Sequence, residues 1–254
     1  MPETRRIKRG WMNLVVRQAI RETHDTKTLI LEDREDGGRP FDFTAGQYLT
    51  FRFDTLAEKP VVRSYTMSGA PSDGDFIAVT VKEVQQGFVS RYLCRDVQPG
   101  DTLRARGPIG RFCYRPEQDL NSLSMVAAGS GVTPFISIMK EYQHCLGTQG
   151  APEQMTLLVS YRSLHDLICK EALEQLSQVP GIRVLISLSQ EAEHPGEPFL
   201  QGRISAAMLD EVFGDYQNQT FMTCGPQGLM DLVRDQVLAH GVDAGQMRSE
   251  SFDN

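Results

Sequence analysis

A glycine turn between an apolar strand and a helix constrains the fold of this chain most. Residues 124–128 form a short apolar run, and apolar residues recur at helical spacing from Pro134 onward. Gly129 and Gly131 stand between them, where the missing Cβ lets the backbone bend tightly and approach a ligand closely. The first N–H groups of the helix would face that ligand, so the turn predicts a phosphate site.

This turn matches the dinucleotide-binding fingerprint only in part. Pro134 occupies the place of the third glycine, and Thr133 precedes it. Proline suits the first turn of a helix because its missing N–H would have had no partner there. An ordinary strand-to-helix turn explains these residues equally well when they are taken alone.

Strand and helix patterns alternate in the second part of the chain. The strand-like segments are 125–128, 156–161, 183–188 and 220–223, and the helical patterns are 134–145, 167–176, 204–212 and 228–240. This alternation predicts an α/β doubly wound parallel sheet with helices on both faces. Ligands of such sheets bind beyond the carboxyl ends of the strands.

The first part of the chain is rich in β-branched and aromatic residues, separated by Gly, Pro and Asp. Its strand-like segments are 14–20, 27–31, 48–53, 61–67 and 76–82. Their regular spacing predicts an antiparallel β-barrel or sandwich, interrupted by one short helix at 89–94. We therefore expect two domains, residues 1–115 and residues 116–254.

Composition excludes several classes of function. A formal net charge of −7 argues against a general nucleic-acid surface, although basic residues cluster near the N-terminus. No apolar run is long enough to span a bilayer and no signal peptide is evident, so we expect a cytoplasmic protein. The five cysteines are scattered without C-x-x-C spacing and the histidines form no close pair, so no metal site is predicted.

Five motifs follow one another in a recognisable order. They are Arg63-Ser64-Tyr65-Thr66, Gly87-Phe88-Val89-Ser90, Gly107-Pro108-Ile109-Gly110, the glycine turn, and Thr223-Cys224-Gly225-Pro226. In this order the chain resembles the ferredoxin–NADP reductase superfamily and, within it, the bacterial NADH-dependent reductases that serve hybrid-cluster proteins. The resemblance covers nearly the whole chain. It implies a flavin-binding barrel that binds FAD, with FMN less favoured, followed by a nicotinamide dinucleotide-binding domain.

The first motif would bind the flavin. Strand alternation places Arg63 and Tyr65 on one face and Ser64 and Thr66 on the other. By resemblance, Arg63 pairs with the flavin pyrophosphate, Tyr65 packs against the isoalloxazine ring and Thr66 lies near flavin N5. A guanidinium fork suits phosphate oxygens better than a lysine point charge does.

The second motif resembles the family's other phosphate contact. Gly87 frees the turn, and the N–H groups of Val89 and Ser90 open a short helix toward the anion, with the Ser90 hydroxyl as a further donor. A plain helix cap is compatible with this reading. Val81 and Lys82 precede the turn as further candidate contacts, but Lys82 is equally well explained as a solvent-exposed charge.

Residues near the C-terminus complete the implied site. By resemblance, Cys224 lies beside nicotinamide C4 and flavin N5, Gly225 lets the backbone approach the dinucleotide, and Pro226 starts the next element. The same resemblance implies that Glu250 belongs to a hydrogen-bond network near the flavin and that Phe252 covers the ring face. A buried cysteine at a strand end and a frayed polar tail are the corresponding structural alternatives.

The implied reaction is hydride transfer from NADH to bound FAD, followed by release of single electrons to a protein acceptor. Thr66, Cys224 and Glu250 are the predicted catalytic residues. The acceptor would be a ferredoxin-like, flavodoxin-like or hybrid-cluster partner, or a C-terminal iron–sulfur domain of the kind several relatives carry beyond the position of Asn254. A dinucleotide-sensing regulatory subunit and a free flavin reductase stay open as alternatives, as does the oligomeric state.

The donor is expected to be NADH. NADPH-specific relatives hold the 2′-phosphate with an arginine where this chain has Gln190, and Glu191, Glu193 and Glu197 lie nearby. A phosphate dianion is disfavoured beside carboxylates without an arginine fork. Arg162, after the second strand of the α/β domain, would still be available to a 2′-phosphate.

Overall fold

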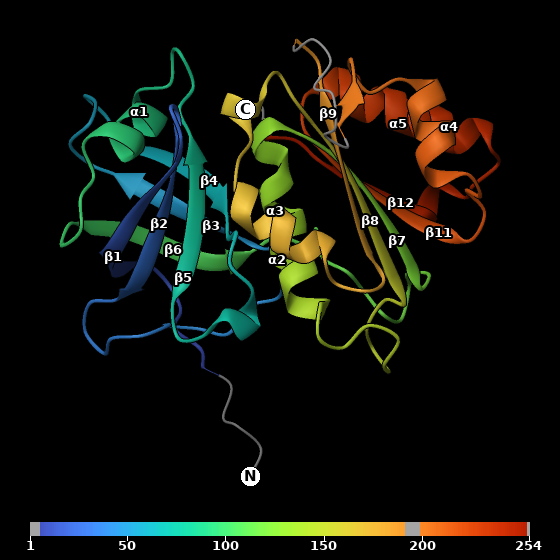
Figure 1. Ribbon diagram of the computed structural model, residues 1–254. Coiled ribbons are helices and arrows are strands. Elements are labelled where there is room, and N and C mark those ends of the chain that lie inside the picture. Colours follow the sequence, from blue (N-terminus) through green and yellow to red (C-terminus); the bar gives the residue numbers. More distant parts are fainter. Residues whose placement is uncertain (1–5, 191–198, 253–254) are drawn as a thin grey trace. The chain divides into compact units, whose positions relative to one another are not determined.

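The computed structural model describes residues 6–190 and 199–252 (Figure 1). The chain divides into two compact units after Cys113, two residues before the boundary expected from the sequence. Each unit is built on its own six-stranded sheet. No helix among the described residues is both long enough and apolar enough to cross a membrane.

The first unit is an antiparallel barrel. Its strands are β1 (Met12–Thr23), β2 (Thr26–Asp33), β3 (Tyr48–Phe53), β4 (Val61–Thr66), β5 (Ile77–Lys82) and β6 (Thr102–Ile109), in the order β4-β3-β6-β1-β2-β5. A β-bridge between Met67 and Val79 joins the end of β4 to β5, so the two edge strands of the sheet meet and close the barrel.

Alternating side chains fill the barrel. Along β3, Leu49, Phe51 and Phe53 are buried in the core, while the residues between them face outward. The helix α1 (Phe88–Arg95) packs against the same core through Val89 and Leu93. Burial of these apolar side chains fixes the register of β3, and with it the outer face that β3 shares with β4 and β6.

The second unit is a doubly wound α/β sheet. Its strands are β7 (Ser122–Ala128), β8 (Gln154–Tyr161), β9 (Ile182–Leu188), β10 (Leu200–Gln201), β11 (Gln219–Cys224) and β12 (Met247–Glu250), all parallel. The order is β10-β9-β8-β7-β11-β12, so the chain reverses direction across the sheet between β7 and β11. Such a switch point is where open α/β sheets bind ligands.

Helices cover both faces of this sheet, as the sequence predicts (Figure 1). The helices are α2 (Thr133–Tyr142), α3 (Lys170–Ser177), α4 (Ala206–Phe213) and α5 (Gln227–Ala239). One core lies between the sheet and the pair α4 and α5, and contains Val126, Leu158, Phe221 and Val233. The predicted fold class, a barrel followed by a parallel α/β sheet, is confirmed.

Three elements of the structure differ from those predicted. β6 and β12 do not appear as apolar runs, because polar residues interrupt β6, which also contains Gly107 and Pro108, and make up most of β12. The helix expected from residue 167 begins at Lys170, after a 3₁₀ turn over Leu164–Asp166 and a left-handed Cys169 with φ 54°. Pairing with neighbouring strands and turn hydrogen bonds stabilise these segments. Neither kind of contact appears as periodic spacing of apolar residues in the sequence.

Candidate functional site

The motif on β4 places a cation and an aromatic ring along one strand edge. Arg63 is exposed, and its guanidinium donates only to the carbonyl oxygen of Val62, at 2.8 Å, within the described part of the chain. Tyr65 is half-buried and packs against Phe51, with ring centroids 6.0 Å apart. Burial raises the pKa of the Tyr65 phenol. Arg63 is therefore available to an anion beside an uncharged aromatic plane.

Thr66 presents a buried hydroxyl without a protein partner. On the same outer face, Ser64 Oγ and Thr50 Oγ1 satisfy each other at 3.0 Å, whereas Thr66 Oγ1 is buried and makes no hydrogen bond to the described residues. Leaving a buried hydroxyl unpaired costs free energy. A ring nitrogen or carbonyl of a bound isoalloxazine would satisfy this hydroxyl, so β4 fits a flavin.

The turn before α1 is held by its own side chains. A Cβ on Gly87 would lie 2.7 Å from Ser90 Oγ and 3.1 Å from the Cβ of Val84. Ser90 Oγ donates to the carbonyl oxygen of Gly87 and accepts from the N–H of Val84, each at 3.0 Å. The Ser90 hydroxyl therefore donates its proton within the turn and not to a ligand. The N–H groups of Val89 and Ser90 lie in the first helical turn, where no intrahelical acceptor exists.

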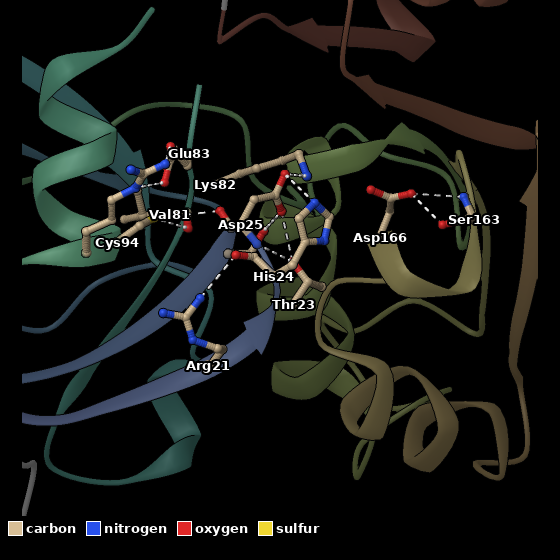
Figure 2. Close-up of polar contacts among 12 residues, drawn as sticks. Arg21, Thr23, His24, Asp25, Val81, Lys82, Glu83, Cys94, Ser163 and Asp166 are labelled. Carbon is tan, nitrogen blue, oxygen red and sulfur yellow. Dashed lines mark hydrogen bonds and ion pairs between the residues drawn. The ribbon is translucent and has the colours of Figure 1, made fainter. Parts of the chain in front are cut away.

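Lys82 and Val81 have structural partners in the barrel. Figure 2 shows the Lys82 ammonium against Asp25, with Nζ 2.6 Å from Oδ2, and Thr23 Oγ1 donates to the same carboxylate at 2.9 Å. Burial raises the pKa of Asp25, but these hydrogen bonds outweigh it and hold that pKa below its usual range. The carbonyl oxygen of Val81 accepts from Cys94 Sγ at 3.2 Å. Lys82 is therefore an ion-paired residue.

The glycine turn joins β7 to α2 through a 3₁₀ segment, Gly129–Val132. Gly129 has φ 55°, a left-handed conformation that other residues adopt at a cost. Thr133 Oγ1 donates to the carbonyl oxygen of Ser130 at 3.0 Å, and Pro134 lies in the first turn of α2. The predicted strand, turn and helix are confirmed. The Thr133 N–H donates to the carbonyl oxygen of Ser130, and Pro134 has no N–H.

Gly131 brings this turn against the end of β11. A Cβ on Gly131 would lie 2.2 Å from the carbonyl oxygen of Cys224 and 2.6 Å from its carbonyl carbon. The strands β7 and β11 are neighbours, with Ala127 opposite Cys224. Gly225 follows with φ 155°, and a Cβ there would lie 3.3 Å from the Ala128 nitrogen. Two motifs far apart in sequence therefore meet at the switch point of the sheet.

Cys224 and Glu250 lie side by side on β11 and β12. They are register partners, and Cys224 is fully buried. Burial raises the pKa of the Cys224 thiol, and the neighbouring Glu250 raises it further, so the thiol stays neutral and is no nucleophile. Glu250 Oε2 is buried without a partner among the described residues. Phe252 follows β12 and is 39% exposed.

The partly buried Glu250 should make the stability of the chain depend on pH. Burial raises its pKa from 4.5 to about 7, so the folded chain keeps this proton over a pH range in which the unfolded chain has lost it. The free energy of unfolding then falls as pH rises through that window. We expect Glu250→Gln to be more stable than the wild type by about 2 kcal/mol near pH 8, allowing for partial exposure, and nearly equal to it near pH 4. Urea unfolding at the two pH values measures this, and an equal difference at both would contradict it.

The residues after β8 are those that the sequence analysis connects with the choice between NADH and NADPH. Arg162 is exposed and makes no side-chain ion pair within the described ranges. Both the hydroxyl and the N–H of Ser163 donate to Asp166 Oδ2, at 2.7 and 3.1 Å (Figure 2). The exposed Gln190 donates its N–H to the carbonyl oxygen of Arg162 at 2.9 Å. The carboxylates Glu191, Glu193 and Glu197 lie outside the described residues.

Sequence reasoning missed two acidic residues of this unit. Asp166 follows Ser163 by three residues, a capping-box spacing that the sequence itself displays. Asp119 accepts both Arg248 nitrogens, Nη1 at 2.6 Å and Nη2 at 2.5 Å, and its side chain is 1% exposed. This ion pair connects β12 to the segment before β7. No local pattern in the sequence predicts a contact between residues so far apart.

Comparison with known proteins identifies both units. Residues 13–114 match the oxidoreductase FAD-binding domain family, and residues 125–235 match the oxidoreductase NAD-binding domain family. The chain belongs to the ferredoxin reductase superfamily. The predicted FAD- and NAD-binding character of these reductase domains is thereby confirmed.

Named relatives agree with this assignment. The chain is 30% identical to the glycine betaine monooxygenase reductase subunit of Chromohalobacter salexigens, over 96% of this chain and 64% of that protein. It is 30% identical to the NADH oxidoreductase HCR of Escherichia coli, over 80% of this chain and 58% of that protein. The chain thus spans less than two thirds of the length of either relative.

A solved structure shows the same fold. The FAD/NAD-binding domain of the nitric oxide dioxygenase of Vibrio cholerae superposes with a TM-score of 0.82 at 26% identity. The match covers 96% of this chain and 99% of that domain, so both units have counterparts there.

Proposed function

We propose that this chain is an NADH-dependent flavoprotein reductase that passes a hydride from NADH to bound FAD and then single electrons to a protein acceptor. Residues 1–115 would hold FAD, and residues 116–254 would bind NADH. The acceptor would be a ferredoxin-like, flavodoxin-like or hybrid-cluster protein, or an iron–sulfur domain. The relatives named as a monooxygenase reductase subunit and an NADH oxidoreductase support this class of reaction.

The observation that carries the proposal is the contact of Gly131 with the carbonyl of Cys224. It brings the glycine turn and the strand-end cysteine together at the switch point, where a dinucleotide would bind. In our proposal the glycine turn, whose backbone can approach a ligand closely, binds its pyrophosphate. The small neutral side chain of Cys224 leaves room for the nicotinamide ring at the end of β11.

The remaining residues would bind and orient the cofactors. Arg63 and the N–H groups of Val89 and Ser90 would hold the diphosphate of FAD, and Tyr65 would support the ring. The Thr66 hydroxyl would donate to, or accept from, the ring edge. Glu250, whose pKa is raised to about 7, would lie beside Cys224 as a proton donor of moderate strength. FAD itself, when bound, converts a two-electron donor into a source of single electrons.

Purification followed by anaerobic mixing with NADH tests the proposal. A reductase is expected to retain FAD, giving a yellow protein, and to lose the visible flavin absorption within the time of one turnover. A regulatory subunit would keep its colour in the presence of NADH, and a free flavin reductase would purify colourless. Either of the last two results would contradict the proposed function.

Thr66→Val should separate catalysis from stability. Valine removes the unpaired buried hydroxyl at nearly constant shape, so we expect unchanged or slightly raised stability, by up to about 1 kcal/mol. The rate of flavin reduction by NADH should fall about tenfold, while the affinity for NADH stays unchanged. Stopped-flow reduction measures both quantities. The matched variant Thr50→Val, one strand away on the same face, should reduce at the wild-type rate, and equal rates in all three proteins would remove Thr66 from its role.

Donor preference should depend on Asp166. A carboxylate bonded to Ser163, next to Arg162, would repel the 2′-phosphate of NADPH. We expect kcat/KM for NADH to exceed that for NADPH by about tenfold or more, and Asp166→Asn to narrow the ratio at least about threefold. Asparagine retains the shape of Asp166 without its charge. A wild-type kcat/KM for NADPH that equals that for NADH would contradict this preference.

A further inference from the structure

Three buried hydroxyls form a hydrogen-bonded chain across the barrel unit, and this chain ends at a carboxylate. Ser68 Oγ lies 2.8 Å from Thr80 Oγ1, and Thr80 Oγ1 lies 2.7 Å from Thr28 Oγ1. Thr28 Oγ1 donates to Glu22 Oε1 at 2.6 Å. The three hydroxyl residues are buried, whereas Glu22 is only half-buried and is partly open to water. We refer to Ser68, Thr80, Thr28 and Glu22 as the hydroxyl chain.

The carboxylate fixes the direction of every hydrogen bond in the hydroxyl chain. A hydroxyl has one proton to donate and two lone pairs that accept. The Thr28 proton goes to Glu22, so Thr28 accepts from Thr80. The Thr80 proton is then used as well, so Thr80 accepts from Ser68. All three protons therefore point toward Glu22, and Ser68 Oγ keeps lone pairs that can accept a further proton.

Strand register places the Ser68 end of the hydroxyl chain beside Thr66. The antiparallel bridge between Met67 and Val79 sets Thr66 opposite Thr80 where β4 and β5 meet. Met67 and Val79 are buried in the barrel core, so the side chains next to them stand on the outer face. The hydroxyl chain thus begins on the same face as the unpaired hydroxyl that we place beside the flavin, and it leads away from there across β5 and β2.

The proposed reaction releases one proton for each NADH that is oxidised. NADH gives up a hydride, which is a proton with two electrons, and single-electron acceptors take only the electrons. NAD⁺ is formed, two acceptor molecules are each reduced by one electron, and the proton of the hydride remains at the ring that received it. Where water is excluded from such a site, this proton needs a path of groups that both accept and donate protons. Hydroxyls do both.

We propose that the hydroxyl chain is a proton relay that carries this proton to Glu22. This inference rests on the proposed function. Ser68 Oγ accepts the arriving proton and passes its own to Thr80. Thr80 protonates Thr28 in the same way, and Thr28 protonates the Glu22 carboxylate. Each hydroxyl oxygen forms one O–H bond and breaks one, so no net charge stays on the buried hydroxyls. Glu22 then gives the proton to water, and rotation about each Cβ–O bond restores the starting directions.

Proton release during reoxidation of the bound flavin tests the relay. The FAD-loaded chain is reduced with a stoichiometric amount of dithionite, which requires no NADH, and is mixed with ferricyanide in weak buffer containing a pH-indicator dye. Thr80→Val keeps the shape of the side chain and breaks the relay at its centre, so we expect proton release to be about tenfold slower than in the wild type. Thr80→Ser retains a hydroxyl and should restore the wild-type rate. Flavin reduction by NADH should be equally fast in all three proteins, because hydride transfer does not use the relay.

Glu22→Gln separates proton uptake from hydrogen bonding. The glutamine oxygen still accepts from Thr28 but takes up no proton, so proton release should again slow about tenfold, with an unchanged midpoint of urea unfolding. The matched control is Thr50→Val, which removes a buried hydroxyl bonded to Ser64 on the outer face of β3. This variant should release the proton at the wild-type rate.

Urea unfolding of the FAD-loaded chain tests the hydrogen bonds without any turnover. Thr80→Val and Thr28→Val remove the same hydroxyl–hydroxyl bond, so the double variant should lose less stability than the sum of the two single losses. Additive losses would contradict the hydroxyl chain.

Three further results would overturn the relay. They are equal rates of proton release in the wild type and Thr80→Val, a wild-type rate in Glu22→Gln, and release in Thr50→Val that is as slow as in Thr80→Val. A wild-type chain whose bound FAD is not reduced by NADH, but whose proton release slows in Thr80→Val and Glu22→Gln, would contradict the proposed function and leave the relay standing. A chain that binds no FAD would contradict both.

Discussion

Gly131→Ala should lower kcat/KM for NADH by about 100-fold. The new methyl group would lie 2.2 Å from the carbonyl oxygen of Cys224, which belongs to the backbone of a central strand and has no rotamer to change. The glycine turn must therefore move away from the end of β11. That movement displaces the turn proposed for the pyrophosphate from the cysteine proposed for the nicotinamide. Steady-state kinetics with a small acceptor measures the loss.

Gly228→Ala is the matched control for this prediction. Gly228 lies in the first turn of α5, and a Cβ there meets nothing within 4 Å. Alanine is favoured over glycine in a helix, so this variant should keep its activity and gain up to about 1 kcal/mol of stability. FAD content should be unchanged in both proteins, because both glycines lie in the α/β unit. Full activity of Gly131→Ala would show that the close approach of Gly131 to the Cys224 carbonyl is not needed for activity.

Asp119→Asn should lower the free energy of unfolding by about 3 kcal/mol. Asp119 is almost fully buried, and its two oxygens hold the guanidinium of Arg248, which is itself 15% exposed. Removing the carboxylate charge leaves Arg248 buried without its counter-ion. Because Arg248 lies on β12, the same change should loosen the strand that sets Glu250 beside Cys224. Urea unfolding followed by circular dichroism measures the stability change.

Asp231→Asn provides the comparison for the ion pair. Asp231 accepts from Arg234 at 2.7 Å on the exposed surface of α5, and such surface pairs contribute at most about 1 kcal/mol. The two substitutions are chemically identical and differ only in burial. Equal losses of stability in the two variants would mean that burial of Asp119 and Arg248 adds nothing.

Strand and helix positions followed from local patterns in this chain. β3 alternates apolar and polar residues from Leu49 on, and β11 is a short segment of apolar and β-branched residues. α2 begins where the glycine turn and Pro134 predict it. Apolar periodicity and turn residues act between close sequence neighbours, so they can be read without knowledge of the fold. β12 lacks such a pattern. Its residues, Met247–Glu250, form a strand because they pair with the edge of β11.

The sequence by itself determined a barrel followed by a doubly wound sheet, and the glycine turn between β7 and α2. Only the tertiary structure decided why Gly131 has no side chain, that Lys82 is paired with Asp25, and that three arginines gather around Trp11. The physical reason is the distance along the chain between the residues that interact. Backbone conformation and periodicity depend on adjacent residues, whereas close approach, ion pairing and burial depend on strand register and on contacts between residues far apart in the chain.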